Sequence, residues 1–302
     1  MKKLKQRTIE KVISFSGIGL HKGEKVEVGL FPAQQNSGIV FIVNNKKIKI
    51  NSKLVKETTL CTGLEFEGVK LNTIEHFMFA LNYLGIDNII VELTDNEMPI
   101  MDGSAMSFVM LLKEAGTKEL YANKKYIKLK KEIKIEHEGK YIIAKPSKSL
   151  KIDLTIDFEH PAIGHQNVVI DGNSNLLNEI SRARTFGFTK DIEFLRANNM
   201  ALGGSLDNAI VLDEYNILNP NGLRMDKEFV YHKLLDFLGD TYIEGLPVVA
   251  DIKAYKSGHH INNLFMREIM SSAENYEIVE IPDVGSELGE KEKAFDFLNI
   301  FS

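Results

Sequence analysis

Three ionisable side chains in segment 229–240 have the spacing that a helical metal site needs. His232, Asp236 and Asp240 follow one another at intervals of four residues. Apolar residues at helical spacing, with Asp226 as the expected N-cap, predict that this segment is a helix. Residues four apart lie on one helix face, so an imidazole and a carboxylate there can bind the same metal ion. The alternative is a solvated polar stripe, which is the ordinary outer face of an amphipathic helix.

A second predicted helix, which starts near Asn72, carries Glu75 and His76 side by side. Metal-assisted hydrolysis needs three protein ligands, an open position for water and a base that takes the water's proton. His76, His232 and Asp236 make a His₂Asp set, and Glu75 is turned from His76 by about 100° around the helix. Two structural interpretations stay open: Asn72 and Glu75 have capping-box spacing, and His76 can be a partly buried structural histidine.

A loop near the end of the chain offers another titratable group. His259 follows Gly258 between a predicted strand at 248–255 and a last helix that ends near Ala273. Loops of this kind often carry catalytic groups, and hydrolysis needs a donor for the oxyanion or the leaving group. His260 stands next to His259, so the residues alone leave two candidates for this role.

The elements that must position these residues follow the same plan twice. Alternating apolar and polar residues predict short strands in the first quarter and again from 127 to 158, and helices follow each set. The composition turns polar around 116–125, so we expect a first domain at 1–122 and a second at 123–275. Residues 276–302 are acidic and weakly patterned, and we expect a loosely attached tail.

Composition narrows the class of protein. The 302 residues carry a net charge of -5, which argues against a general nucleic-acid binder. Local basic runs are solvated edges or contacts to a polyphosphate or a membrane surface. Cys61 is the only cysteine, so we expect no internal disulfide and a reducing, cytoplasmic location. There is no signal-peptide core and no run of 18 apolar residues, so we expect no transmembrane segment.

Eight segments, in order along residues 1 to about 273, carry a resemblance to one enzyme family. They are Ser16-Gly-Ile-Gly-Leu-His-Lys-Gly, Thr73-Ile-Glu-His, Pro99-Ile-Met-Asp-Gly-Ser-Ala, Asp157-Phe-Glu-His-Pro, Ser181-Arg-Ala-Arg-Thr-Phe-Gly-Phe, Leu202-Gly-Gly-Ser, His232-Lys-Leu-Leu-Asp and Lys256-Ser-Gly-His. The chain resembles the zinc-dependent UDP-3-O-acyl-N-acetylglucosamine deacetylases, which perform the committed step of lipid A synthesis in Gram-negative bacteria. The resemblance implies an α+β fold of two domains with similar topology. Each would be a two-layer sandwich of a mainly antiparallel sheet and helices, with the active site between the domains.

The resemblance also implies a metal site and the residues around it. One zinc ion per chain would be held by His76, His232 and Asp236, and such N/O sites also accept Fe²⁺ in vivo. Glu75 would be the general base for the zinc-bound water. His259 would be the protonated partner that helps the amine to leave.

Three further roles complete the catalytic set that the resemblance implies. Asp240 would orient His259. Thr185 would hydrogen-bond the tetrahedral oxyanion, and Lys233 would hold polar groups of the substrate.

Substrate contacts follow from the same resemblance. An insert of the second domain at about 186–211 would form an apolar passage for the 3-O-acyl chain. The residues implied there are Leu20, Phe186, Ile192, Leu195, Ala201, Ser205, Ala209 and Val211. Three further residues would contact the uridine diphosphate: Lys145, Phe158 and His160. His260 departs from the family, where small apolar residues are common at this position.

Two rival functions stay open. One is a metallo-deacetylase that acts on another sugar nucleotide, which activity on acylated and non-acylated substrates would separate. The other is a non-catalytic sugar-nucleotide or lipid-binding protein, which the intact set of Glu75, His259 and three ligands disfavours. The expected partner is a small-molecule substrate, acylated UDP-N-acetylglucosamine. We expect a monomer with at most a loose contact to a membrane surface.

Overall fold

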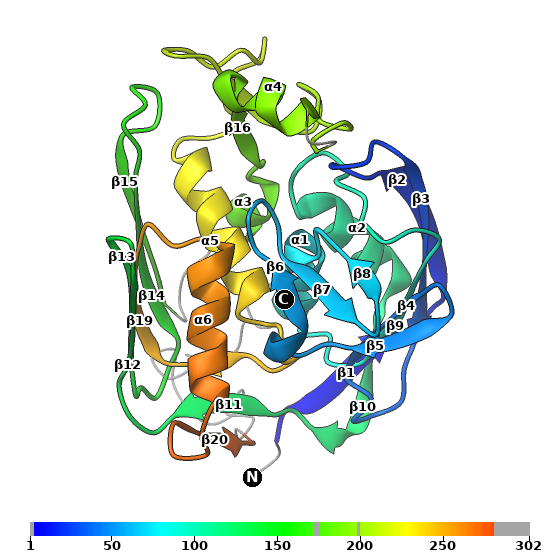
Figure 1. Cartoon of the computed structure of the whole chain (residues 1–302). Coiled ribbons are helices and arrows are strands. Elements are labelled where there is room, and N and C mark those ends of the chain that lie inside the picture. Colours follow the sequence, from blue (N-terminus) through cyan, green and yellow to red (C-terminus); the bar gives the residue numbers. More distant parts are fainter. Residues whose placement is uncertain (1–2, 172–175, 198–199, 281–302) are drawn as a thin grey trace.

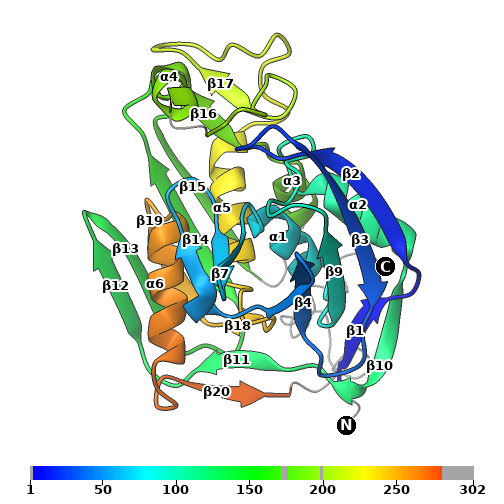
Figure 2. The same cartoon turned by 45° about the vertical axis from the view of Figure 1, so that its right-hand side comes forward.

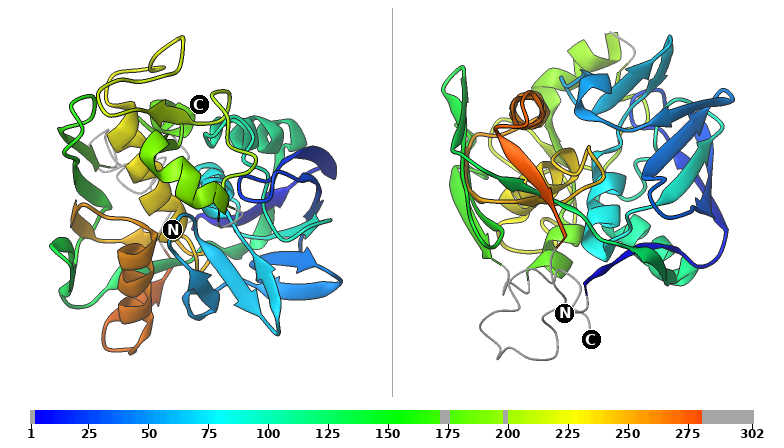
Figure 3. Two further views of the ribbon diagram at one scale, coloured as in Figure 1. Left: turned by 45° about the horizontal axis from the view of Figure 1, so that its top comes forward. Right: turned by 90° about the horizontal axis from the view of Figure 1, so that it is seen from below.

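The structure is a computed structural model, and it describes residues 3–171, 176–197 and 200–280. Two five-stranded sheets form the outer layers, and most of the helices lie between them (Figure 1). Seen from below, the sheets lie on opposite sides of the helices (Figure 3). No helix in the described ranges is long and apolar enough to cross a membrane.

The first sheet has the strand order β2-β3-β9-β4-β5, and only β4 and β9 run parallel. Its strands are β2 (Ile13–Ile18), β3 (Lys25–Pro32), β4 (Ile39–Val43), β5 (Lys46–Lys49) and β9 (Ile89–Leu93). Side chains alternate between the two faces, so one face is apolar and packs against helices. Phe41 on this face packs edge-on against Phe77 of a helix, and Phe15 packs in the same way against Phe108.

The second sheet repeats this arrangement with the order β12-β13-β19-β14-β15, in which only β14 and β19 run parallel. Its strands are β12 (Ile133–His137), β13 (Lys140–Lys145), β14 (Lys151–Asp157), β15 (His165–Asp171) and β19 (Asp251–Tyr255). Strand by strand, the connections match those of the first sheet. The predicted α+β class, with two mainly antiparallel sheets of similar topology, is therefore confirmed.

The helices between the sheets bring the two halves into contact. They are α1 (Glu75–Leu84), α2 (Met106–Ala115), α3 (Leu177–Arg182), α5 (Glu228–Asp240) and α6 (His259–Met270). Helix α1 packs on α2 and on α5, and α5 packs on α6 (Figure 2). The α1–α5 contact is very close: a Cβ atom on Gly239 would lie 2.1 Å from the carbonyl oxygen of Glu75. Only glycine therefore allows this approach.

Two predicted helix starts are wrong. Helix α5 begins at Glu228 after Lys227, which has a left-handed conformation with φ of 61°, and Asp226 does not cap it. Helix α1 begins at Glu75 after Ile74 and has no side-chain cap, so the capping box of Asn72 and Glu75 does not form. In both places the first helical residue is a buried glutamate with a tertiary partner, which outweighs the local capping preference.

Smaller sheets complete the fold. They comprise β1 (Lys5–Ile9) with β10 (Thr117–Asn123); β6 (Val55–Glu57), β7 (Gly63–Phe66) and β8 (Val69–Leu71), preceded by the 3-10 turn η1 (Ser52–Leu54); and β11 (Tyr126–Leu129) with β18 (Val248–Val249) and β20 (Tyr276–Val279). Strand β20 falls within the segment expected to be a loose tail. It pairs antiparallel with β11 over four residues because an aromatic and β-branched segment completes the open edge of that strand. The rest of the expected tail, 281–302, lies outside the described residues.

The expected insert forms a separate layer at the top of Figure 1. It contains β16 (Phe186–Phe188), α4 (Thr189–Ala197) and β17 (Ile210–Leu212), and its two strands are parallel. Two backbone hydrogen bonds join it to the loop after β2, from Leu202 N to His21 O and from Gly203 N to Leu20 O. The insert therefore bridges from the second half of the chain to the first.

Candidate active site

Three buried ligand groups meet where α1 and α5 touch. Each of His76, His232 and Asp236 offers one ligand atom, a ring nitrogen or a carboxylate oxygen, and these atoms lie within 4.8 Å of one another. Nε2 of His232 is 3.4 Å from Oδ1 of Asp236, and Nε2 of His76 is 3.6 Å from the same oxygen. Ligand atoms at about 2.0–2.1 Å from a tetrahedral zinc ion lie about 3.3–3.4 Å apart. The spacing fits a divalent metal, and burial rules out the solvated stripe.

The protonation of these groups also fits a metal. Nδ1 of His232 donates to the carbonyl of Ala183 at 3.1 Å, which leaves the Nε2 lone pair directed at the site. Burial lowers the pKa of His232 to about 3, so its imidazole is neutral at pH 7.

Asp236 supplies the strongest sign that a cation belongs here. Its Oδ2 accepts a hydrogen bond from Lys233 at 3.0 Å, whereas its buried Oδ1 has no hydrogen-bond partner among the described residues. Burial by itself raises the pKa of Asp236, but its histidine and lysine neighbours outweigh that effect and hold the pKa well below its usual range. A buried, unpartnered carboxylate oxygen is costly. A metal ion that it shares with His76 and His232 would remove that cost.

Glu75 lies beside this group at the first turn of α1. Its Oε2 accepts a hydrogen bond from the backbone N–H of Thr62 at 3.0 Å instead of capping its own helix. Burial raises the pKa of the Glu75 carboxyl, and the charges of His259 and His76 oppose that rise only in part. A carboxylate of raised pKa is well suited to accept a proton near neutral pH.

His259, at the start of α6, lies beside a carboxylate that favours its protonated, charged form. Its Nδ1 lies 2.9 Å from Oδ2 of Asp240, and that oxygen also accepts from Asn262 Nδ2 at 2.8 Å. Burial alone would lower the pKa of His259, but the charge of Asp240 and the hydrogen bond to it raise the pKa to about 9. His260 is exposed instead, with its ring 4.9 Å from that of His137. Of the two neighbouring histidines, His259 is therefore the buried one, held by Asp240.

A buried ion pair holds the segment that contains Thr185 against the start of α5. The guanidinium of Arg184 contacts both carboxylate oxygens of Glu228, at 2.9 and 3.1 Å, at the start of α5. The backbone N–H of Thr185 donates to Gly103 at 2.8 Å, which ties the same segment to the first half of the chain. Ala183, two residues before Thr185, is the residue whose carbonyl accepts the hydrogen bond from His232. The segment 183–185 is thus fixed relative to α5.

A model of one enzyme family matches this chain over residues 6–271. Its description is UDP-3-O-acyl N-acetylglycosamine deacetylase, LpxC. The chain belongs to this family. Similar curated proteins named UDP-3-O-acyl-N-acetylglucosamine deacetylase come from Shewanella violacea, Shewanella sp. (strain W3-18-1) and Shewanella baltica. Each is 48% identical over 282 residues, which is 91% of this chain and 92% of the relative. The resemblance is confirmed, and the chain belongs to a family of hydrolases.

Several residues that were expected to contact substrate lie close together beside α5. The Phe186 ring lies 5.6 Å from that of Phe158 and 6.2 Å from that of His232. The ammonium of Lys233 lies 5.4 Å over the same Phe186 ring. His160 lies at the edge of this aromatic group, 5.7 Å from the Phe188 ring.

The hydrogen bonds of His160 limit what it can do. Its Nδ1 accepts from Ala162 N at 3.1 Å, so its Nε2 carries the proton and donates to Asp213 O at 2.8 Å. Both nitrogens are therefore occupied, and the ring can offer a ligand its face and edge only.

The ligand group, Glu75, His259 and the pocket that His259 lines are together called the cleft. The insert, with Leu20 beside it, contains the other expected residues. Ile192 and Leu195 lie three apart on α4, and both are partly exposed. Leu20 lies opposite, where its Cδ1 is 3.7 Å from the Cβ position of Gly204. Of the other expected positions, Ser205 is exposed and three are partly exposed: Ala201, Ala209 and Val211.

Lys145 does not join the other expected residues. It pairs with Asp251 at the start of β19, whereas the cleft lies beyond Tyr255 at the end of that strand. Four residues of strand separate the two ends by about 13 Å. The ammonium of Lys145 lies 3.6 Å from Glu132 instead. Sequence could not show this, because the pairing register of β13 decides which of its ends reaches the cleft.

The opposite end of β13 brings a lysine that the sequence analysis missed. Lys140 lines a pocket of about 410 Å³ together with Lys233, His137, His259 and His260. The pocket therefore combines two ammonium groups and three imidazoles with one carboxylate, that of Glu138. The signal in the sequence was the turn before Lys140. Only the pairing of β13 with β19 shows that this end of β13 lies near the start of α6.

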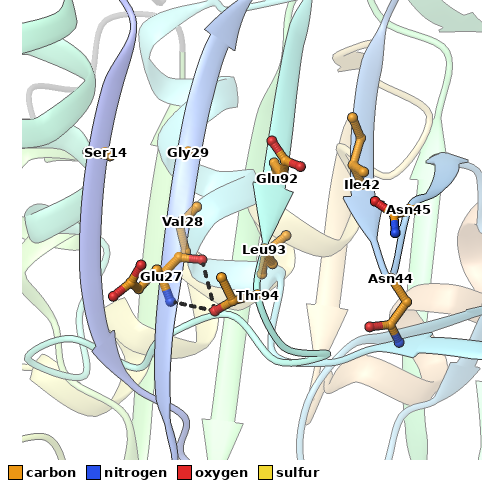
Figure 4. A pocket seen from close by; sticks show the side chains of 10 residues that line it. All are labelled: Ser14, Glu27, Val28, Gly29, Ile42, Asn44, Asn45, Glu92, Leu93 and Thr94. Carbon is orange, nitrogen blue, oxygen red and sulfur yellow. Dashed lines mark hydrogen bonds between the residues drawn. The ribbon is translucent and has the colours of Figure 1, made fainter.

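Another hollow of about 410 Å³ lies on the outer face of the first sheet (Figure 4). Gly29 forms its floor between Ser14 and Glu92, which are its partners on the neighbouring strands. This hollow contains carboxylates but no histidine. In the described part of the chain, the group of His76, His232 and Asp236 is the single set of ligands arranged for a metal, so the cleft is the candidate active site.

Proposed function

We propose that this protein hydrolyses the N-acetyl group of UDP-3-O-(3-hydroxyacyl)-N-acetylglucosamine and releases acetate, as a step of lipid A synthesis. The observation that carries the proposal is the buried His₂Asp group, with a carboxyl of raised pKa, Glu75, and an imidazole of raised pKa, His259, as its neighbours. Two titratable groups with opposite roles beside a ligand set are what amide hydrolysis requires.

The ligand set suits zinc. Two imidazole nitrogens and one carboxylate bind Zn²⁺ well, and Fe²⁺ is accepted by the same donors. A divalent metal held there supplies Lewis acidity for the hydrolysis. His76, His232 and Asp236 would each provide one ligand atom.

The chain's own groups then divide the proton transfers between them. The Glu75 carboxylate takes a proton from the water that attacks the acetyl carbonyl carbon. As the C–N bond breaks, the His259 imidazolium gives its proton to the leaving amine, and Asp240 keeps the ring oriented. The Thr185 hydroxyl donates to the oxygen that becomes negative during attack.

Substrate recognition is assigned to both sides of the cleft. Partly exposed apolar side chains of the insert, such as Ile192 and Leu195, would contact the acyl chain. The pocket with Lys140 and Lys233 would bind the diphosphate, because ammonium groups suit phosphate oxygens. Lys140 takes the role that the sequence analysis had given to Lys145.

Acetate release from the acylated UDP-sugar tests the proposal. We expect turnover that a chelator abolishes and that added Zn²⁺ restores. The same sugar nucleotide without the acyl chain should react far more slowly, since each buried CH₂ contributes about 0.8 kcal/mol to binding. Equal activity on both substrates would instead indicate a deacetylase of another sugar nucleotide. Turnover unaffected by complete metal removal would contradict the proposed chemistry.

A further inference from the structure

One buried threonine contacts both sides of the acid–base pair. Thr62 lies in the loop between β6 and β7, and its backbone N–H donates to Oε2 of Glu75 at 3.0 Å. Its hydroxyl donates to Oδ1 of Asp240 at 2.5 Å and lies 3.3 Å from Nδ1 of His259. One residue therefore binds the expected base through its main chain and the partner of the expected acid through its side chain.

Backbone hydrogen bonding and burial both restrain Thr62. Its carbonyl accepts from the backbone N–H of Ile74 at 3.3 Å, immediately before Glu75. Its side chain is buried and β-branched, so few rotamers are open to it. Thr62 and Asp240 are 178 residues apart in the chain, and they belong to different halves of the fold. The contact is thus a direct polar link between the halves, made inside the cleft.

The link also completes the hydrogen bonding of Asp240. Oδ2 of this carboxylate is shared by His259 and Asn262, whereas the hydroxyl of Thr62 holds Oδ1. A carboxylate bound at one oxygen can still rotate about its Cβ–Cγ bond. Donors on both oxygens fix its plane, and with it the direction of the His259 ring.

We propose that Thr62 is a positioning residue for hydrolysis, whose hydroxyl orients Asp240 and thereby the His259 ring relative to Glu75. The inference rests on the proposed function, because it assigns Thr62 a part in the same proton transfers. The hydroxyl of Thr62 contacts Asp240 and His259, so the effect of removing it passes through these two side chains.

Thr62→Val tests this, because valine keeps the shape and the backbone N–H to Glu75 but removes the hydroxyl. We expect kcat to fall about 10–100-fold, as is typical when a partner of a site residue is removed, with KM and metal content unchanged. Thr62→Ser should restore most of kcat. In an Asp240→Asn background, Thr62→Val should cause little further loss, because coupled residues are not additive.

A matched control separates this effect from a general loss of a buried hydroxyl. Thr241 follows Asp240, is buried, and donates only to the carbonyl of Phe237 at 2.8 Å, so Thr241→Val should keep wild-type kcat. If the valine variant of Thr62 does not fold, Thr62→Ala removes the hydroxyl without adding bulk beside Asp240.

The outcomes can be told apart. An active wild type with unchanged kcat in Thr62→Val would overturn this inference and leave the proposed function standing. The same would follow if Thr62→Val caused its full loss in the Asp240→Asn background. A wild type that releases no acetate would instead contradict the proposed function, and the role of Thr62 would fall with it.

Discussion

His232 and His259 are both buried histidines in one cleft, yet their pKa values move in opposite directions. Burial favours the neutral form of each ring. The Nδ1 atom of His232 donates to an uncharged carbonyl, so burial prevails and its pKa falls to about 3. The Nδ1 atom of His259 faces the Asp240 carboxylate, and its pKa rises to about 9. The hydrogen-bond partner therefore decides which histidine can bind a metal and which can give up a proton.

The pH dependence of kcat should reflect this difference. Activity should rise with pH as Glu75 loses its proton, and fall above about pH 9, where His259 loses the proton that the leaving amine needs. We expect His259→Ala to reduce kcat about 10²–10⁴-fold and to remove the alkaline limb. The exposed neighbour serves as the control: His260→Ala should keep that limb. If the limb disappeared in His260→Ala and persisted in His259→Ala, the acid would be misassigned.

At the scale of elements, the contact between α1 and α5 sets the geometry of the ligands. His76 comes from the first turn of α1, and His232 and Asp236 come from the middle of α5. The two helices approach closely enough that no side chain fits at Gly239. Because each helix belongs to a different half of the fold, the ligand set exists only while this contact is intact.

Gly239→Ala should therefore destabilise the protein even though alanine favours helices. The gain in helix propensity is about 1 kcal/mol, whereas a methyl group 2.1 Å from a backbone oxygen forces the helices apart. We expect a net loss of about 2 kcal/mol or more in the free energy of unfolding, together with weaker zinc binding. Denaturant unfolding and metal titration would measure both effects.

The control for this variant is another glycine. An added methyl group at Gly187 meets no atom within 4 Å, so Gly187→Ala should leave the free energy of unfolding within about 0.5 kcal/mol of wild type. A Gly239→Ala variant as stable as this control would show that the α1–α5 spacing is less constrained than the structure indicates.

For the whole molecule, the sequence predicted the class of fold and an active site between its halves, but not the register in which the strands pair. Alternation along strands and helical spacing were enough to expect two α+β halves, because these patterns are local. Pairing register is not local, and for that reason Lys145 was placed in the cleft where the structure brings Lys140. Strand β20 was missed for a related reason, since its four residues form a strand only against the open edge of β11.

The candidate site shows the same limit. His76, His232 and Asp236 were expected from residue type, helical spacing and family resemblance, and the structure brings them together. Thr62 carried no signal in the sequence, because its hydroxyl meets a carboxylate 178 residues away. The role of Thr62 depends on how the two halves pack against each other, and no sequence motif predicts that packing.

The metal content of the folded protein tests the central claim most directly. We expect one divalent ion per wild-type chain by elemental mass spectrometry. His232→Ala should fold and retain less than about a tenth of that amount, because one of three ligands is lost. His165→Ala, which removes an exposed histidine from β15, should bind the ion like wild type. Stoichiometric, tightly bound metal in His232→Ala would contradict the account.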